Sequence, residues 1–150
     1  MVDVSKRCKY ALKAMFELAL RNSQRPVKIH EVAAAQGVPV RFLEAIMNQL
    51  RKAGLVDSIR GSAGGYVLAK GPSSTTIGDI IAAVGDPLGM RHPSQERVRS
   101  DVYHYGDYAL GQFWKEVHEA VEAAYQGMSL AHLSEIEKAH VQSQTLNYSI

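Results

Sequence analysis

The 150-residue sequence has a single cysteine, Cys8, and no long apolar run. One cysteine excludes an internal disulfide and a CxxC-type metal site. No segment approaches the ~20 consecutive apolar residues that a membrane span requires. The basic N-terminus also lacks the uninterrupted apolar stretch of a secretory signal. We therefore expect a cytoplasmic protein with no membrane partner.

Catalytic signatures are lacking as well. The sequence has no Ser/His/Asp order with supporting context, no paired carboxylates with a pocket and no HExxH motif, so we expect that the protein is not an enzyme. The glycine-rich residues 61–66 could in principle cradle a nucleotide phosphate. This alternative is weak, because the segment leads into a β-prone run instead of a helix and has no GK[ST] ending.

Positive charge is concentrated in the first half of the chain. Residues 1–70 hold twelve Lys/Arg and five Asp/Glu, a net charge of +7, whereas the remaining residues hold five and ten, a net charge of −5. This asymmetry suggests that the N-terminal half faces a polyanion. The alternative is an uneven solvated surface.

Apolar periodicity predicts three helices, over residues 6–20, 29–36 and 39–53. Gly37 is expected to end the second helix and Pro39 to open the third at its first position. The apolar stripe of the third helix consists of Phe42, Leu43, Ile46, Met47 and Leu50. Two short helices separated by a brief turn are typical of a helix-turn-helix motif.

Two short β-prone runs follow, at residues 55–59 and 66–68, and predict a β-hairpin. Three glycines would let its turn fold tightly: Gly61, Gly64 and Gly65. Arg60 stands at the tip, where a positive side chain suits the negative potential of a DNA minor groove. A hairpin placed after two helices makes a winged helix-turn-helix.

The remaining chain divides into a short helix over residues 77–84, a loop over 86–106, a long helix over 107–128 and a final helix from Ser129. The polar tail from Gln142 is expected to fray. The long helix carries a heptad seam: Leu110, Trp114, Val117, Val121, Ala124 and Met128. The seam predicts a dimer interface, and its alternative is packing within the monomer.

Three segments resemble a known family: KYALKAMFELAL, FLEAIMNQLRKAGLVDSIRGSAGGYVLAK and TIGDIIAAVGDPL. They are similar to the IscR/NsrR/CymR-type transcription regulators of the Rrf-two family, closely over residues 4–88 and more loosely beyond. The resemblance implies a mainly α fold, a winged helix-turn-helix with a long C-terminal dimerisation helix. It divides the chain into a DNA-binding domain (1–85), a sensor loop (86–106) and a dimerisation region (107–150). It also implies a homodimeric repressor that binds double-stranded DNA at an inverted repeat.

The same resemblance makes residues 40–52 the recognition helix, with Arg41 and Glu44 contacting bases and Arg60 entering the minor groove. The other expected DNA contacts are Lys6, Lys9, Lys28, Arg51, Gly61 and Ser62. Glu44 could instead be a solvated helix residue, and Arg51 could hold a local salt bridge.

Two departures from the family pattern stand out. Cluster-binding members carry three cysteines in the loop before the dimerisation helix, but residues 89–108 contain none here. We therefore expect no iron–sulfur cluster, no bound metal and no other cofactor. Pro39 also stands where a polar N-cap residue is expected.

The signal that such a protein would sense stays open. A metal ion held by His104 with Asp101 or Asp107 is one alternative, although exposed loop histidines without ligand spacing are favoured. Basic neighbours would favour a reactive Cys8 thiolate and an intersubunit disulfide, but a partly buried thiol is favoured. The remaining alternatives are a small-molecule pocket near Trp114 and a protein partner docked on the acidic C-terminal half.

Overall fold

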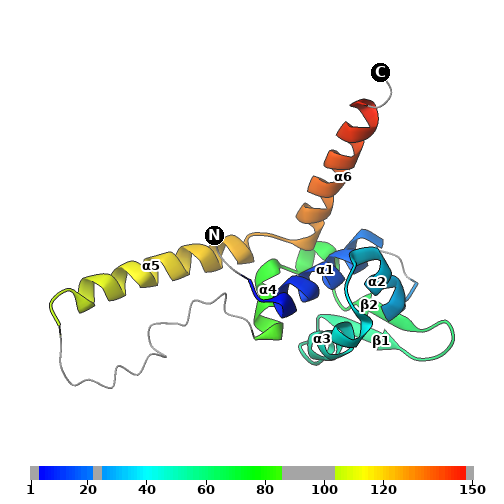
Figure 1. Ribbon diagram of the computed structural model, residues 1–150, viewed down its shortest axis with the longest axis horizontal. Helices are drawn as coiled ribbons and strands as arrows, with labels where there is room; N and C mark the ends of the chain where they lie inside the picture. The colour runs from blue at the N-terminus through cyan, green and yellow to red at the C-terminus, as the bar shows by residue number, and fades with distance from the viewer. Residues whose placement is uncertain (1–3, 22–24, 86–103, 148–150) are drawn as a thin grey trace.

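The structure is a computed structural model that describes residues 4–21, 25–85 and 104–147. It is mainly helical with one two-stranded antiparallel sheet, as predicted. In chain order the elements are α1 (Lys6–Arg21), α2 (Ile29–Gln36), α3 (Val40–Lys52), β1 (Val56–Ile59), β2 (Gly65–Leu68), the 3₁₀ turn η1 (Pro72–Ser74), α4 (Ile77–Val84), α5 (Asp107–Gln126) and α6 (Leu130–Asn147). Figure 1 shows α1 to α4 and the hairpin gathered together, with α5 and α6 projecting from them in different directions.

The first three helices lie within a residue or two of their predicted bounds because glycine and proline delimit them. Gly37 ends α2 in the left-handed conformation (φ 61°), as expected. Pro39 was predicted as the first helical residue, but its ψ of 131° places it one step earlier, at the N-cap. There its carbonyl accepts hydrogen bonds from Phe42 and Leu43, so proline takes the place of the expected polar residue without supplying a side-chain cap.

The helix α3 buries a narrower stripe than predicted. Four of its apolar residues are buried: Leu43, Ile46, Met47 and Leu50. Phe42 is 45% exposed, so its assignment to the buried stripe is wrong. At about 100° per residue, it lies to one side of the arc that the other four occupy.

The hairpin pairs Val56 with Leu68 at one end and Ile59 with Gly65 at the other. A third segment joins it, since Val27 and Tyr66 exchange two backbone hydrogen bonds of 2.9 and 2.8 Å. The turn needs glycine at Gly64, where a Cβ would lie 2.1 Å from the carbonyl oxygen of Ile59. This anchoring fixes the direction in which the hairpin leaves α3.

Backbone contacts attach α5 and α6 to the N-terminal part. The amide of Ile77 donates to the carbonyl of Met128, and the amide of Leu130 donates to that of Thr75. Thr76 caps α4 by accepting from the amide of Asp79 at 3.1 Å. The expectation that the chain frays from Gln142 is wrong, because α6 continues to Asn147.

One apolar cluster joins the helices, with α1 at its centre between α3 and α4, and Leu130 of α6 closing it. Its largest fully buried side chains are Met15, Leu43, Met47, Leu50, Ile80 and Leu130. Burying each such side chain contributes about 1.5–3 kcal/mol. Among the described helices, none combines the length and the apolar character that crossing a bilayer requires.

Candidate nucleic-acid interface

The solvent-facing side of α3 carries mostly polar and charged residues, with apolar ones at its N-terminal end. Its exposed residues are Val40, Arg41, Phe42, Glu44, Ala45, Asn48, Arg51 and Lys52. Arg41 and Glu44 lie in the first two turns, the part of a recognition helix that meets base edges. Arg51 donates a hydrogen bond of 3.1 Å to Asn48, a local contact that is not the salt bridge considered from the sequence.

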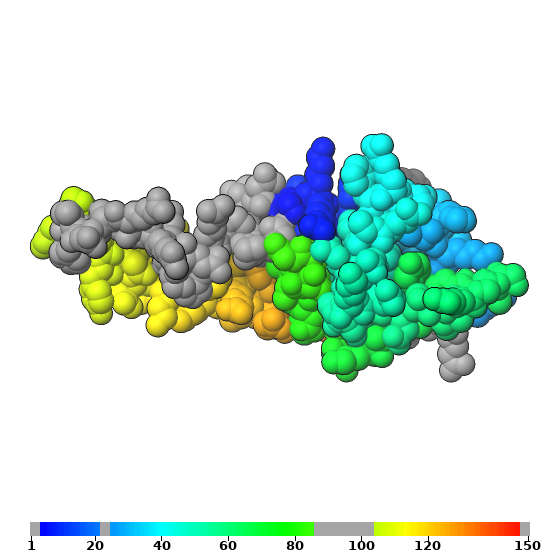
Figure 2. Space-filling model, turned by 90° about the horizontal axis from the view of Figure 1, so that it is seen from below, coloured from blue at the N-terminus to red at the C-terminus, as the bar shows by residue number. Residues whose placement is uncertain are grey.

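The tip of the hairpin, which we call the wing (residues 60–64), follows directly from β1. Arg60, Gly61 and Ser62 are exposed there. Gly61 has a φ of 108°, a backbone conformation that residues other than glycine rarely adopt. Figure 2 shows the wing, in green, on the same face of the molecule as α3, in cyan, with the start of α1, in blue, beside α3. The structure therefore brings together the two elements that the sequence predicts to contact DNA.

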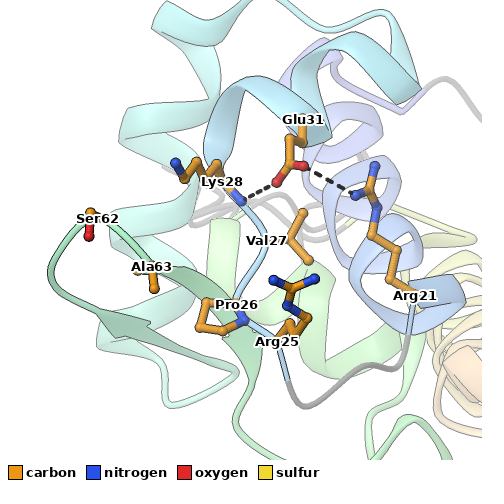
Figure 3. A pocket seen from close by; sticks show the side chains of 9 residues that line it. Arg21, Arg25, Pro26, Val27, Lys28, Glu31, Ser62 and Ala63 are labelled. Carbon is orange, nitrogen blue, oxygen red and sulfur yellow. Dashed lines mark hydrogen bonds and ion pairs between the residues drawn. The ribbon is translucent and has the colours of Figure 1, made fainter.

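The start of α2 and the wing face each other across a hollow. Lys28 extends from the start of α2 toward Ser62 and Ala63 (Figure 3). The Lys28 amide donates to Glu31 at 2.9 Å, and Glu31 lies 3.8 Å from the guanidinium of Arg21. Lys28 and Ser62, both predicted as phosphate contacts, thus line one site.

Arg25 lines the same hollow and was missed by the sequence reasoning. It belongs to the polar segment before Pro26, whose composition is typical of a connection between helices. The only signal that could have identified it was its positive charge close to Lys28.

The start of α1 borders the N-terminal half of α3. Lys6 and Arg7 line a cavity of about 420 Å³ together with Tyr10 and residues of α3. Lys6 therefore lies beside exposed residues of α3, and its role as a phosphate contact stays a prediction. Lys9 is exposed on the same helix but does not line this cavity.

Cys8 is completely buried between α1 and its neighbours. Desolvation by burial, and then the nearby Cys8, raise the pKa of Tyr125 of α5. Tyr125 packs against the apolar cluster to which Cys8 belongs. An intersubunit disulfide needs an accessible thiolate. The geometry favours the buried structural thiol over the redox alternative.

The heptad seam of α5 is divided in the structure. Leu110 and Trp114 are 59% and 54% exposed. By contrast, Val121 and Met128 pack against the apolar cluster of the monomer, which is the alternative considered for this seam. Val117 is half-buried and Ala124 is exposed. Within α5, the apolar face of the first half is therefore not buried by any other described residues, whereas that of the second half packs against the core.

The structure describes two of the three residues considered as metal ligands, His104 and Asp107, while Asp101 lies outside the described residues. Asp107 accepts a 2.8 Å hydrogen bond from the backbone amide of His104, so its carboxylate is hydrogen-bonded to the backbone just before α5. Over the three described ranges, no group of three His, Cys, Asp or Glu side chains could hold a metal ion.

The chain matches the model of the Rrf2 family, described as iron-dependent transcriptional regulators, over residues 4–136. An rrf2-like HTH-type transcriptional regulator of Rhodobacter capsulatus is 44% identical over 88 residues, which cover 57% of this chain and 59% of that protein. Two solved structures are similar, each with a TM-score of 0.72: IscR of T. potens (31% identity, 91% of this chain, 90% of that one) and CymR, the global cysteine regulator of B. subtilis (30% identity, 91% and 98%).

The iron dependence in that family description raises the question of which residues of this chain could hold an iron–sulfur cluster. Iron–sulfur clusters in proteins are held mainly by several cysteine thiolates. The whole sequence has one cysteine, and Cys8 is buried in the apolar cluster. The donor set for a cysteine-ligated cluster is therefore missing from the sequence itself.

Proposed function

Because the chain belongs to the Rrf2 family of DNA-binding transcription regulators, we propose that it acts as a homodimeric repressor on an inverted-repeat operator. The observation that carries the proposal is the position of the exposed side of α3 and of the wing on one face (Figure 2). One element has the size and polarity to enter a major groove, and the other is thin enough for a minor groove.

In this proposal α3 lies in the major groove and reads bases through its first two turns. Arg41 can donate two hydrogen bonds to guanine, and Glu44 can accept one from a cytosine amino group. Arg60 enters the adjacent minor groove from the wing. Lys28 and Ser62 flank a phosphate across the hollow of Figure 3, while Lys6, Lys9 and Arg51 contact the backbone elsewhere.

The exposed first half of α5 supports the proposed homodimer. Leu110, Phe113 and Trp114 are each more than half exposed, and Phe113 and Trp114 pack edge to face with ring centroids 5.0 Å apart. Aromatic residues in such a patch are typical of interface anchors. A symmetric dimer would place its two α3 helices in successive major grooves about 34 Å apart.

Fluorescence anisotropy with a salt titration tests the proposal, using fragments that the full-length protein recovers from genomic DNA. Affinity should fall steeply as salt rises, because phosphate contacts release counterions. Arg60→Ala should weaken binding by about 1–3 kcal/mol. Lys115→Ala is the matched control, since it removes one exposed positive charge from α5. Equal effects of the two substitutions, or no bound fragment, would contradict the proposal.

We also propose that the signal is not a cysteine-ligated iron–sulfur cluster. The burial of the lone Cys8 supports this. Protein purified without oxygen should be colourless, without the visible absorption of thiolate-bound iron. A coloured protein that bleaches in air would overturn the proposal.

A further inference from the structure

Phe42 is an apolar side chain exposed on the recognition helix. It stands in the first turn of α3, beside Arg41, and is 45% exposed. Leaving a phenylalanine in contact with water forgoes much of the free energy that its burial would contribute. A single exposed apolar residue is common on protein surfaces, so the surroundings of the ring decide whether it has a role.

Two neighbours hold the Phe42 ring in place. The ring of Tyr10 lies 5.9 Å away, centroid to centroid, at an angle of 40°. The guanidinium carbon of Arg41 lies 4.8 Å from the Phe42 centroid, within cation–π distance. The ring is thus supported by an aromatic residue of α1 and by a cation of its own helix, which together orient it at the surface.

The ring also lines the cavity of about 420 Å³ between α1 and α3. Phe42, Ala45 and Ile46 make its α3 wall apolar, while three cations lie around it: Lys6, Arg7 and Arg41. A ligand that fits must combine negative charge with a small apolar group. Duplex DNA offers this combination in the major groove, where phosphates flank the 5-methyl group of thymine.

We propose that Phe42, with Ala45 beside it, recognises the 5-methyl group of a thymine in the operator. The inference rests on the proposed DNA-binding function and deepens it, because it assigns a thymine to the edge of each half-site, next to the bases that Arg41 and Glu44 read. The contact is apolar, so it distinguishes thymine from both cytosine and uracil without a hydrogen bond.

Replacing single thymines by deoxyuridine tests this contact, because the change removes the methyl group and leaves base pairing intact. The probe is a duplex recovered from genomic DNA by the full-length protein, with each thymine replaced in turn and affinity measured by anisotropy. One position in each half-site should lose about fourfold in affinity, the effect of one buried methyl group.

The uracil penalty should disappear in Phe42→Ala and persist in part in Phe42→Leu, which keeps apolar bulk. Leu146→Ala, a change at an exposed apolar residue of α6, should keep the full penalty. Circular dichroism establishes that each variant is folded.

A penalty at no position, or an equal penalty in the wild type and in Phe42→Ala, would overturn the thymine contact. In that case a steep salt dependence of binding would leave the proposed DNA-binding function standing. Failure to recover any duplex from genomic DNA would contradict both the thymine contact and the proposed DNA-binding function.

Discussion

Gly64 is the residue on which the shape of the wing most depends. A Cβ there would lie 2.1 Å from the carbonyl oxygen of Ile59 and 2.9 Å from that of Gly61. Both obstacles are backbone atoms, which cannot rotate away as the end of a side chain can. The turn therefore accepts only glycine at this position.

Gly64→Ala should lower the free energy of unfolding by about 1–3 kcal/mol, the usual cost of forcing a group into occupied space. Gly71→Ala is the control, because its Cβ would meet no atom within 4 Å and its φ of −58° suits alanine. Urea denaturation of both variants measures the difference. Equal stability of the two would show that the turn is not as tight as described.

Glu17 is a buried carboxylate that joins α1 to α2. It accepts hydrogen bonds from the Arg21 side chain at 2.6 Å and from the Gln36 amide at 2.8 Å. Glu17→Ala should cost about 1–3 kcal/mol of unfolding free energy, because it leaves polar partners unsatisfied. Glu137→Ala on the exposed side of α6 should change stability by about 0.5 kcal/mol or less. Thermal melting of the two variants checks this, and an unchanged midpoint for Glu17→Ala would contradict it.

At the residue scale, the sequence predicts the positions of exposed charged residues and of turn glycines better than it predicts which apolar residues are buried. Arg41, Glu44 and Arg60 are exposed where predicted. Phe42 was assigned to the buried stripe because its hydrophobicity matched the pattern, although its angular position lies at the edge of it. The orientation of its ring depends on Tyr10, a neighbour far away in the sequence that no local pattern reveals.

Among the elements, α5 contains two halves that differ in how far their apolar residues are buried. Val121 packs on the monomer's own cluster, while Trp114 is 54% exposed. Trp114→Ala should therefore weaken the proposed dimer at least tenfold, since a buried aromatic anchor is worth about 2 kcal/mol or more, while the melting temperature of the monomer changes little. Sedimentation over a range of protein concentrations measures the dimer.

Val121→Ala should act in the opposite way. It should lower the unfolding free energy by about 1 kcal/mol and leave the dimer affinity nearly unchanged. If both substitutions weakened the dimer and neither changed stability, the whole seam would lie in the interface, as the heptad pattern alone suggests.

The bounds of the elements followed from the sequence because Gly37, Pro39 and Gly54 stand at helix boundaries. The partner of each apolar face did not. A heptad repeat indicates that a helix face is covered but does not distinguish a second copy from the core of the same chain. The position of α5 depends on long-range contacts, such as the hydrogen bond from Thr76 to Gln126 at 3.0 Å.

For the whole molecule, the charge asymmetry agrees with the arrangement of the elements. The cationic first 70 residues include the start of α1, α3 and the wing, which share one face (Figure 2), whereas the acidic remainder includes the projecting α5 and α6 (Figure 1). The long-range field of such a distribution steers the N-terminal part toward DNA and turns the C-terminal part away from it. The side of the molecule that carries α3 and the wing is thus expected to face the duplex.

Methylation interference with dimethyl sulfate tests the central claim most directly, because it marks guanine N7 in the major groove and adenine N3 in the minor groove. On a duplex bound by the full-length protein, we predict two symmetric guanine sets about 34 Å apart, where α3 enters, each with a neighbouring adenine set where Arg60 enters. The Arg60→Ala variant should lose only the adenine signals. Interference confined to one groove, or sets without two-fold symmetry, would contradict the account.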